Sequence, residues 1–341
     1  MNTFYQSATA VGALLMLFGC IGEEPINLNT ANFNLTVSDA AMDGMDSIVV
    51  VYSNATLIPL DGSKPTIIDI ESRHAEKGRV DLLDYQGSNK ANLISNQAIP
   101  PGDYQLCLTV FNGESQNESL SHVVESNTYV LTPLTIQNTG ICPKGLEVDG
   151  TSTLFFNSTL LLESGDNHFI AEFDLRGGLK APTDSSDPYT IESDSVTLID
   201  ERDAGLLSGT ISHSIVEQCR IDNRVAFTVD AVYLYPRRVA RSNMGGFSNE
   251  GLYAVAPVAA ANVTTYDGIH YEFDIGYVEE GTYSLGYTCV ADKDRANIDH
   301  ANKDQAGQSE HVSPAFNIYQ AEQPVRVYPQ HVSEVDFSFV I

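Results

Sequence analysis

Short runs of alternating or β-branched residues recur along the whole chain and constrain its fold more than any other feature. Clusters of Gly, Pro, Asn, Asp and Ser separate them, and no long stretch has helical periodicity. Such spacing is typical of antiparallel β-sandwiches. The sequence therefore predicts an all-β protein of two antiparallel β-sandwich domains with little helix. The predicted strands are residues 33–37, 47–60, 66–70, 103–111, 128–136, 153–163, 168–175, 189–200, 206–212, 225–235, 251–258, 269–278, 282–291, 314–319, 324–328 and 334–341.

Two segments are predicted as short helices, GSNKANLISN (87–96) and LRGGLK (175–180). A weak internal repeat links IPPGDYQLCLTV (99–110) with VEEGTYSLGYTCV (278–290). In both, a turn glycine precedes X-Tyr-X-Leu and an apolar strand with a cysteine, and alternate residues of such a strand share one face. The repeat suggests two sandwiches with related cores.

The predicted domains are residues 32–212 and 213–341, with the boundary near HSIVEQ (213–218).

The first 19 residues are predicted to be a lipoprotein signal peptide. The apolar run that ends at Cys20 is too short to span a bilayer, which needs about 20 apolar residues, and has the length of a signal-peptide core. Its last four residues, LFGC (17–20), resemble the bacterial lipobox, although MNTFYQS at the start has no Lys or Arg. The alternative is an ordinary secretory signal with a chance cysteine.

The lipobox resemblance implies that Cys20 carries the lipid anchor, palmitate-type acyl chains included. Two or three chains anchor stably where one does not. Residues 20–31 then form a lipidated linker. Ile21 stands where an Asp suggests inner-membrane retention, which favours the outer membrane, on either its periplasmic or its cell-surface face.

The acidic composition of the chain limits the kinds of molecule that it can bind. The formal net charge is −27 and no basic patch is present, which excludes nucleic acid as a partner. Contact with the membrane is expected through the lipid anchor alone, and a protein or glycan partner is left open.

The other four cysteines lie two in each half of the chain. Export places them in an oxidising compartment, where pairing is expected. Of the three possible connectivities, proximity and the domain split favour Cys107–Cys142 and Cys219–Cys289. Metal ligation is the alternative, but there is no C-x-x-C and no nearby His pair.

The stretch FNLTVSDAAMDGMDSIVVVYSNATLIPLDG, followed by RVDLLDYQG, LISNQAIPPGDYQLCLTV, HFIAEFDLRGGL and LLSGTIS, resembles the bacterial domain of unknown function 4382. The resemblance covers residues 32–212 and implies an exported or lipid-anchored β-protein, with no established activity. Cys107 stands where the family usually has a basic residue, so its disulfide is a local addition.

Residues 225–341 more loosely resemble the transthyretin-type sandwiches of carboxypeptidase regulatory domains. AVYLYP, GTYSLGYTC and VDFSFV carry this resemblance. It implies a structural or binding module.

Catalytic signatures are missing from the sequence. There is no H-E-x-x-H, G-x-S-x-G, P-loop or G-x-G-x-x-G, and GGFSNEG (245–251) has the wrong spacing for a nucleophile elbow. The eight His residues are scattered, and a pair of acids suited to glycoside hydrolysis cannot be selected from 45 without a fold. We expect no catalytic residues, no cofactor and no enzymatic activity.

Two acidic loops are candidates for a cation site. ADKDRANIDHANKD (291–304) offers Asp292, Asp294 and Asp299 as Ca²⁺ ligands, because hard oxygen ligands suit calcium. The plainer interpretation is a charged inter-strand loop. SDAAMDGMD (38–46) is interpreted as a solvated turn.

The sequence predicts a lipid-anchored envelope protein with a non-enzymatic binding or structural role at the bacterial outer membrane. The alternatives are a secreted-type hydrolase and a glycan-binding surface module. A pocket with a shifted carboxylate pair would favour the hydrolase. A row of exposed tyrosines on one sheet would favour glycan binding, and the chain has 16 Tyr and no Trp.

Overall fold

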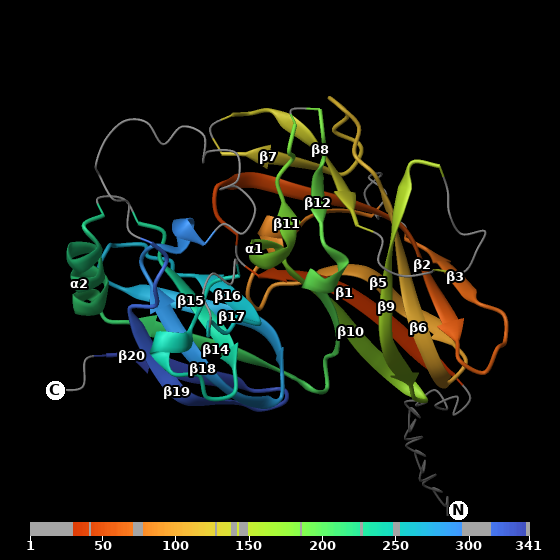
Figure 1. The fold of residues 1–341 in the computed structure, drawn as a ribbon. Helices are drawn as coiled ribbons and strands as arrows, with labels where there is room; N and C mark the ends of the chain where they lie inside the picture. Colours follow the sequence, from red (N-terminus) through yellow and green to blue (C-terminus); the bar gives the residue numbers. More distant parts are fainter. Residues whose placement is uncertain are drawn as a thin grey trace, which may run out of the picture.

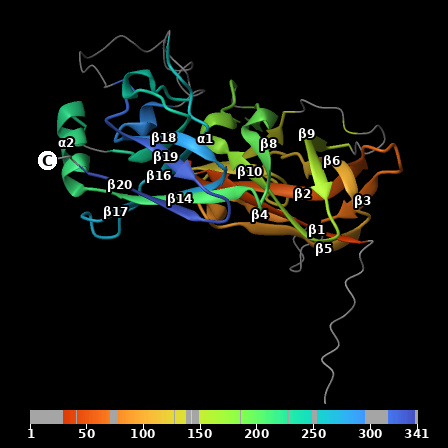
Figure 2. The same cartoon turned by 90° about the horizontal axis from the view of Figure 1, so that it is seen from below.

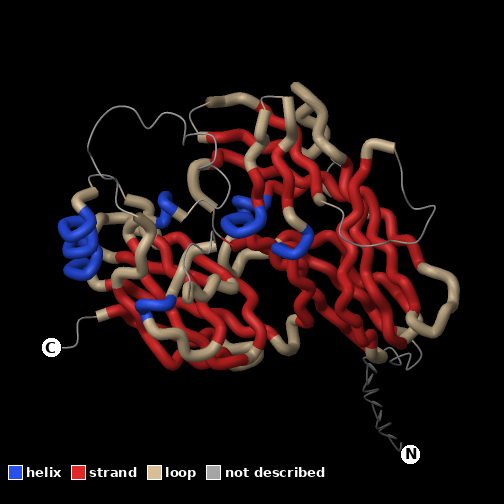
Figure 3. Tube along the Cα trace, viewed as in Figure 1, coloured by secondary structure: helices blue, strands red, loops and turns tan. Residues whose placement is uncertain are grey.

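A computed structural model describes residues 30–40, 42–70, 78–126, 128–137, 142, 149–184, 186–225, 228–247, 253–294 and 315–338. The predicted signal peptide and Cys20 lie outside the described residues. No helix in the described part of the chain is long and apolar enough to cross a membrane. Strands dominate the fold (Figure 3), as predicted.

The N-terminal half, residues 30–200, pairs a small sheet with a large one (Figure 1). The small sheet has the order β13-β10-β1-β5, with bounds Val196–Asp200, Gly165–Asp174, Ala31–Ala40 and Ala91–Ile99. The large sheet has the order β11-β12-β8-β7-β2-β6-β9, and β3 and β4 also pair with β2. Its strands are β2 (Met45–Pro59), β3 (Thr66–Asp69), β4 (Arg79–Asp81), β6 (Gly102–Phe111), β7 (His122–Glu125), β8 (Leu131–Ile136), β9 (Thr151–Leu162), β11 (Leu179–Lys180) and β12 (Tyr189–Ile191).

Alternation along the strands builds the core between these sheets. On β1, Phe33, Leu35 and Val37 face the core, and Phe169 and Phe173 of β10 join them. Side chains at the intervening positions of β1 and β10 therefore point to the other face of the small sheet. That face is covered by the C-terminal half.

The C-terminal half, residues 204–338, has two sheets and one longer helix. The three-stranded sheet has the order β17-β14-β20, with bounds Tyr271–Glu279, Ala204–Ile211 and Val332–Phe337. The four-stranded sheet has the order β16-β15-β18-β19, with bounds Ala259–Asn262, Ala231–Pro236, Gly281–Thr288 and Gln320–Val327. The helix α2 (His213–Asn223) lies at the outer end of this half, and the two halves sit side by side (Figures 1 and 2).

Most strand pairs are antiparallel, as the sequence predicts. Three pairs are parallel: β1 with β10, β8 with β12, and β14 with β20. Parallel partners need long connections between them, so local alternation does not reveal them.

Both predicted disulfides are present. Cys107 on β6 joins Cys142, and Cys219 on α2 joins Cys289 just after β18. Cys219 and Cys289 lie in the core of the C-terminal half, whereas Cys107 alternates with core leucines and faces the outer side of the large sheet.

The helix predictions are right in one case and wrong in another. LRGGLK contains the short helix α1 (Leu175–Gly178), which Asp174 caps by accepting a hydrogen bond from the Gly177 N–H. Within GSNKANLISN, residues from Ala91 form β5 against β1, so tertiary pairing overrides local propensity there. The helix α2 was not predicted, because its apolar face is narrow and a disulfide holds it to the core.

The turn of residues 201–203 separates strands of the two halves, since β13 before it pairs with β10 and β14 after it pairs with β17 and β20. Val196 belongs to the N-terminal core, whereas Leu207 and Ile211 of β14 belong to the C-terminal one. We infer that the domain boundary lies at this turn, before the LLSGTIS strand, and not near residue 213 as predicted.

Candidate functional site

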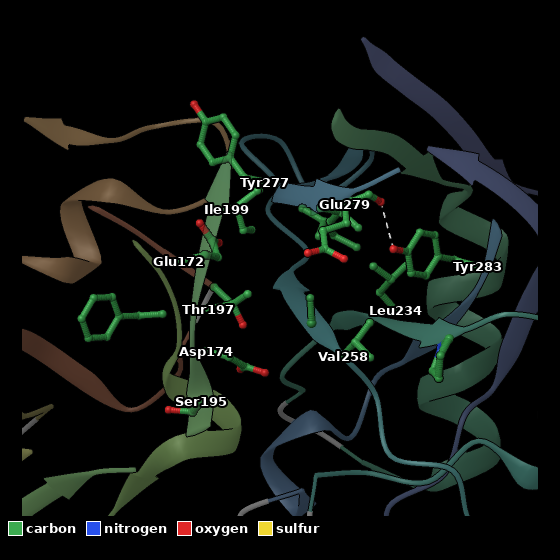
Figure 4. Close-up of a pocket in the computed structure, with 17 residues that line it drawn as sticks. Glu172, Asp174, Ser195, Thr197, Ile199, Leu234, Val258, Tyr277, Glu279 and Tyr283 are labelled. Carbon is green, nitrogen blue, oxygen red and sulfur yellow. Dashed lines mark hydrogen bonds between the residues drawn. The ribbon is translucent and has the colours of Figure 1, made fainter. Parts of the chain in front are cut away.

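A cleft of about 340 Å³ lies where the two halves meet (Figure 4). One wall carries Glu172 and Asp174 of β10, with residues of β13 beside them. The opposite wall carries Leu234 of β15, Val258 next to β16, and residues 275–279 of β17. We call this site the acidic cleft. It exists only when both halves are folded together.

The alternation of β10 places the two acids in the acidic cleft. Phe173 points into the N-terminal core, so its neighbours Glu172 and Asp174 point to the opposite face. Because the C-terminal half covers this face, both carboxyl groups are removed from bulk water.

Burial raises the pKa values of both carboxyl groups. The pKa of Glu172 rises from 4.5 to about 8, chiefly because of desolvation, with Asp174 adding to it and the Ser38 hydroxyl opposing it. The pKa of Asp174 rises from 3.8 to about 7, again chiefly by desolvation, although the Gly177 N–H and the Arg176 guanidinium lower it. Near neutral pH both carboxyl groups therefore retain protons for part of the time.

Glu172 has unused hydrogen-bonding capacity. Its Oε2 is buried and has no hydrogen-bond partner. The side chain reaches the opposite wall, where a Cβ placed on Gly276 would lie 3.0 Å from its Oε1 and 2.6 Å from the Gly87 carbonyl oxygen. A glycine at position 276 therefore lets the two halves approach closely at this point.

A third acid lies on the core side of the small sheet. Asp39 continues the inward series of β1 and is fully buried, and neither carboxyl oxygen has a partner with good hydrogen-bond geometry, although the Leu175 N–H and the Gln86 side chain lie near enough to lower its pKa. Desolvation, followed by the charges of Glu172 and Asp174, raises its pKa well above the ordinary value. Three carboxyl groups thus share one poorly solvated region.

The opposite wall combines apolar and hydroxyl groups. The Tyr283 hydroxyl donates to the Glu279 carbonyl oxygen at 2.9 Å, and the Glu279 carboxylate points into the cleft (Figure 4). Desolvation, with acids nearby, raises the pKa of Tyr277 to about 12, so its phenol stays protonated.

A buried arginine joins the two halves beside the acidic cleft. Arg176 forms an ion pair with Asp43 and donates to Asn262 Oδ1 at 2.6 Å. Its guanidinium also lies 5.9 Å from the ring centroid of Tyr233. Removing either charge would leave the other buried without its partner.

The stretch SDAAMDGMD is therefore not a solvated turn, which corrects the sequence interpretation. Asp39 is buried, Asp43 pairs with Arg176, and Asp46 accepts a hydrogen bond from the Ser126 hydroxyl at 2.7 Å. Burial engages Asp39 and pairing across the interface engages Asp43, whereas Asp46 is exposed.

The predicted calcium ligands are only partly described. Asp292 pairs with Lys293 at 2.8 Å, Asp294 is buried and accepts from the Phe247 N–H at 3.0 Å, and Asp299 lies outside the described residues. No three His, Cys, Asp or Glu side chains are grouped to hold a metal ion in the described ranges. Calcium binding stays a prediction.

Exposed tyrosines are spread over several loops. Four tyrosine side chains are between 49% and 86% exposed, and each lies in a different connection between strands: Tyr129, Tyr253, Tyr266 and Tyr328. They do not form the row on one sheet that would favour a glycan platform.

Sequence reasoning did not identify Glu172 and Asp174. HFIAEFDL places acids at alternate positions of a strand, a pattern that normally indicates a solvated face. Only the docking of the C-terminal half makes that face buried.

The fold and the cleft together define a two-part β-sandwich protein with a buried acidic site between its halves. Residues 30–193 match the family described as Domain of unknown function (DUF4382). This confirms the predicted domain over most of its expected span, and the transthyretin-like resemblance of residues 225–341 stays a prediction. None of the curated proteins compared matches the sequence.

Several solved structures are similar at low identity. A provisionally named cell adhesion protein from Bacteroides fragilis has 6% identity and a TM-score of 0.20, covering 89% of this chain and 92% of its own. A provisionally named adhesin from Bacteroides ovatus has 12% identity and a TM-score of 0.18, covering 96% and 100%. A provisionally named polysaccharide-binding protein from Bacteroides thetaiotaomicron has 9% identity and a TM-score of 0.16, covering 89% of each chain. At such TM-scores the likeness carries no argument about function.

Proposed function

We propose that this protein is a lipid-anchored binding protein of the bacterial outer membrane that holds a ligand in the acidic cleft without chemical turnover. The observation that carries the binding role is Glu172, whose Oε2 is buried without a partner at a cleft lined from both halves. Buried polar groups are normally hydrogen-bonded, and an orphan in a cleft is one that a ligand can satisfy.

The anchor is supported by LFGC at the end of the apolar run. In a Cys20→Ala variant, we expect loss of acylation and release of the protein from the detergent phase, or retention of an unprocessed precursor. Phase partitioning and intact mass of the envelope protein measure this. A Cys20→Ala protein that keeps the mature mass and the detergent partitioning would contradict lipid anchoring.

The cleft is tested by filling it. Val258 lines the acidic cleft and is 49% exposed, so Val258→Trp adds bulk there without entering a core. Ile67→Trp, at a 54% exposed position on β3, is the matched control. Native mass spectrometry of the mature protein, incubated with a small-molecule extract of the envelope, should detect an adduct that Val258→Trp removes and Ile67→Trp retains. An absence of adducts on the wild-type protein, or equal adducts on all three, would overturn the binding role of the cleft.

A hydrolase is the second candidate function, and one observation favours it. Glu172 and Asp174 form a carboxyl pair with raised pKa values in a cleft, and Glu279 lies on the opposite wall. Glycoside hydrolysis needs two carboxyl groups on either side of the bond that is cleaved. Because Glu172 and Asp174 share one wall, the opposed pair would be Glu279 with one of them.

Turnover assays separate the two functions. Under the binding proposal, a panel of chromogenic glycosides and esters should give no hydrolysis above the buffer rate. Hydrolysis that Glu279→Gln and Glu172→Gln each abolish, and that Glu272→Gln on the exposed edge of β17 leaves unchanged, would establish the hydrolase instead.

A further inference from the structure

The charge of the acidic cleft is one-sided. Glu172, Asp174 and Glu279 line it, and no Lys, Arg or His is among the described residues that line it. Nearby cations are already engaged, since Arg176 pairs with Asp43 and Lys90 pairs with Glu201. When Glu172 and Asp174 ionise, the described lining therefore offers them no cation, and the nearest one, Arg176, is shared with Asp43.

An unpartnered oxygen provides a second, independent observation. Glu172 Oε2 is buried and makes no hydrogen bond, and a Cβ placed on Gly276 would lie 3.0 Å from the other oxygen of the same carboxyl group. A carboxylate accepts hydrogen bonds and gains most from a charged donor. Glu172 Oε2 thus lacks a donor, although the Ser38 hydroxyl hydrogen-bonds to the same carboxyl group.

The other residues that line the acidic cleft indicate the size and polarity of the rest of the ligand. Ile199, Leu234, Val258 and Ile275 supply apolar surface on both walls. A volume of about 340 Å³ suits a small molecule and lies at the lower end of the range for ligand pockets. A bare metal ion would leave this apolar surface uncovered.

We propose that the acidic cleft binds a small organic amine, with its ammonium group at Glu172 and Asp174 and its alkyl or aryl body against Leu234 and Val258. This inference rests on the proposed binding function and names the ligand class of the same site.

Binding of an ammonium group is coupled to proton release. The cation favours the ionised carboxyl groups, so protons that Glu172 and Asp174 hold near neutral pH pass to the buffer on binding. Since those protons must leave, affinity falls as the pH is lowered below about 7 to 8. Each released proton weakens binding by about tenfold per pH unit.

Other titratable groups face the pair from the surrounding elements. These groups are Asp39 from β1, Arg176 from α1, Tyr277 and Glu279 from β17, Tyr283 from β18, and Asp294. The phenols and the guanidinium keep one protonation state between pH 6 and 8, because Tyr277 and Tyr283 have raised pKa values and arginine stays protonated. The pKa of Asp39 is raised by burial and by the charges of Glu172 and Asp174, so the pH dependence belongs to these three coupled carboxyl groups.

Isothermal titration of the mature full-length protein tests the inference with n-hexylamine, hexan-1-ol and hexanoate as probes of equal length. We expect hexylamine to bind at least about tenfold more tightly than either other probe. Its affinity should rise at least about tenfold from pH 6 to pH 8, with proton release detected by repeating the titration in buffers of different ionisation enthalpy. Glu172→Gln and Asp174→Asn should each weaken hexylamine at least about tenfold, and the exposed control Glu272→Gln should not.

Three results would overturn the amine class. The first is that hexan-1-ol binds as tightly as hexylamine. The second is that Glu172→Gln and Asp174→Asn leave the affinity for hexylamine unchanged. The third is that Ca²⁺ displaces hexylamine at equal concentration. If a neutral or anionic probe binds and Val258→Trp removes it, the cleft is still a binding site and only the ligand class is wrong. If no probe binds and the envelope extract also gives no adduct, the proposed function itself fails. Circular dichroism of each variant confirms folding before titration.

Discussion

Replacing Glu172 with Gln should stabilise the protein at high pH, because it removes a charge that the folded state disfavours. Gln has the shape of the protonated carboxyl group and cannot ionise. The pKa of Glu172 is raised from 4.5 to about 8 on folding. A carboxyl group with a raised folded-state pKa binds more protons when folded, so wild-type stability is greatest below the unfolded pKa and is lost as pH rises through 4.5 to 8.

The size of the effect follows from the same shift. Ionising the group in the folded state costs about 1.4 kcal/mol for each pKa unit. Relative to the wild type, Glu172→Gln should therefore gain about 1 kcal/mol at pH 5 and about 4 kcal/mol at pH 8 in the free energy of unfolding. Relaxation of the cleft around the charge reduces the second figure, so a pH-dependent gain of about 2 to 4 kcal/mol is expected.

Urea unfolding at pH 5, 6, 7 and 8 measures this gain. Glu272→Gln, an exposed glutamate replaced in the same way, should follow the wild type at every pH. Removing the Glu172 charge also relieves Asp39, whose pKa that charge raises, and this adds to the gain of Glu172→Gln in the same direction. A difference between Glu172→Gln and the wild type that does not grow with pH would refute the argument that burial holds this carboxyl group protonated.

Three further perturbations probe the interface and one disulfide. Arg176→Met should lower the free energy of unfolding by about 3 to 5 kcal/mol, because Asp43 is left without its partner. In the same thermal melt, Arg202→Met, which breaks the more exposed pair with Asp200, should cost less than about 1 kcal/mol. Cys219→Ser with Cys289→Ser opens a loop of 70 residues and should cost about 4 kcal/mol in denaturant unfolding; an unchanged midpoint would contradict a structural role for this bond. Gly276→Ala should cost about 1 to 3 kcal/mol by thermal melting, since its Cβ would meet a backbone carbonyl oxygen at 2.6 Å, and a neutral result would mean that the halves separate freely there.

Alternation and turn chemistry are properties of neighbouring residues, and the sequence reports them directly. Strands such as Gly102–Phe111 and Gly281–Thr288 could be predicted because apolar and polar positions alternate along them. The four paired cysteines could be matched because the chain divides them two and two. These features depend on short stretches of chain or on simple counting.

Long-range pairing is decided only in three dimensions. The β5 segment has polar residues that suggest a short helix, yet its backbone completes the edge of a sheet beside β1. The β14 strand follows the N-terminal half in sequence but pairs with β17 and β20. In each case the partner strand lies far away in the sequence and supplies the hydrogen bonds.

The sequence by itself determined that this is an acidic, strand-built protein with one disulfide in each half. Glu172 and Asp174 alternate with the core residues Ala171, Phe173 and Leu175, which is the pattern of a strand with one solvated face. The tertiary structure alone decided that these two acids are buried at a cleft. The physical reason is that a strand's pattern distinguishes its two faces but does not reveal what covers each face. Here the outer face is covered by another part of the same chain, and desolvation by that contact produces the site.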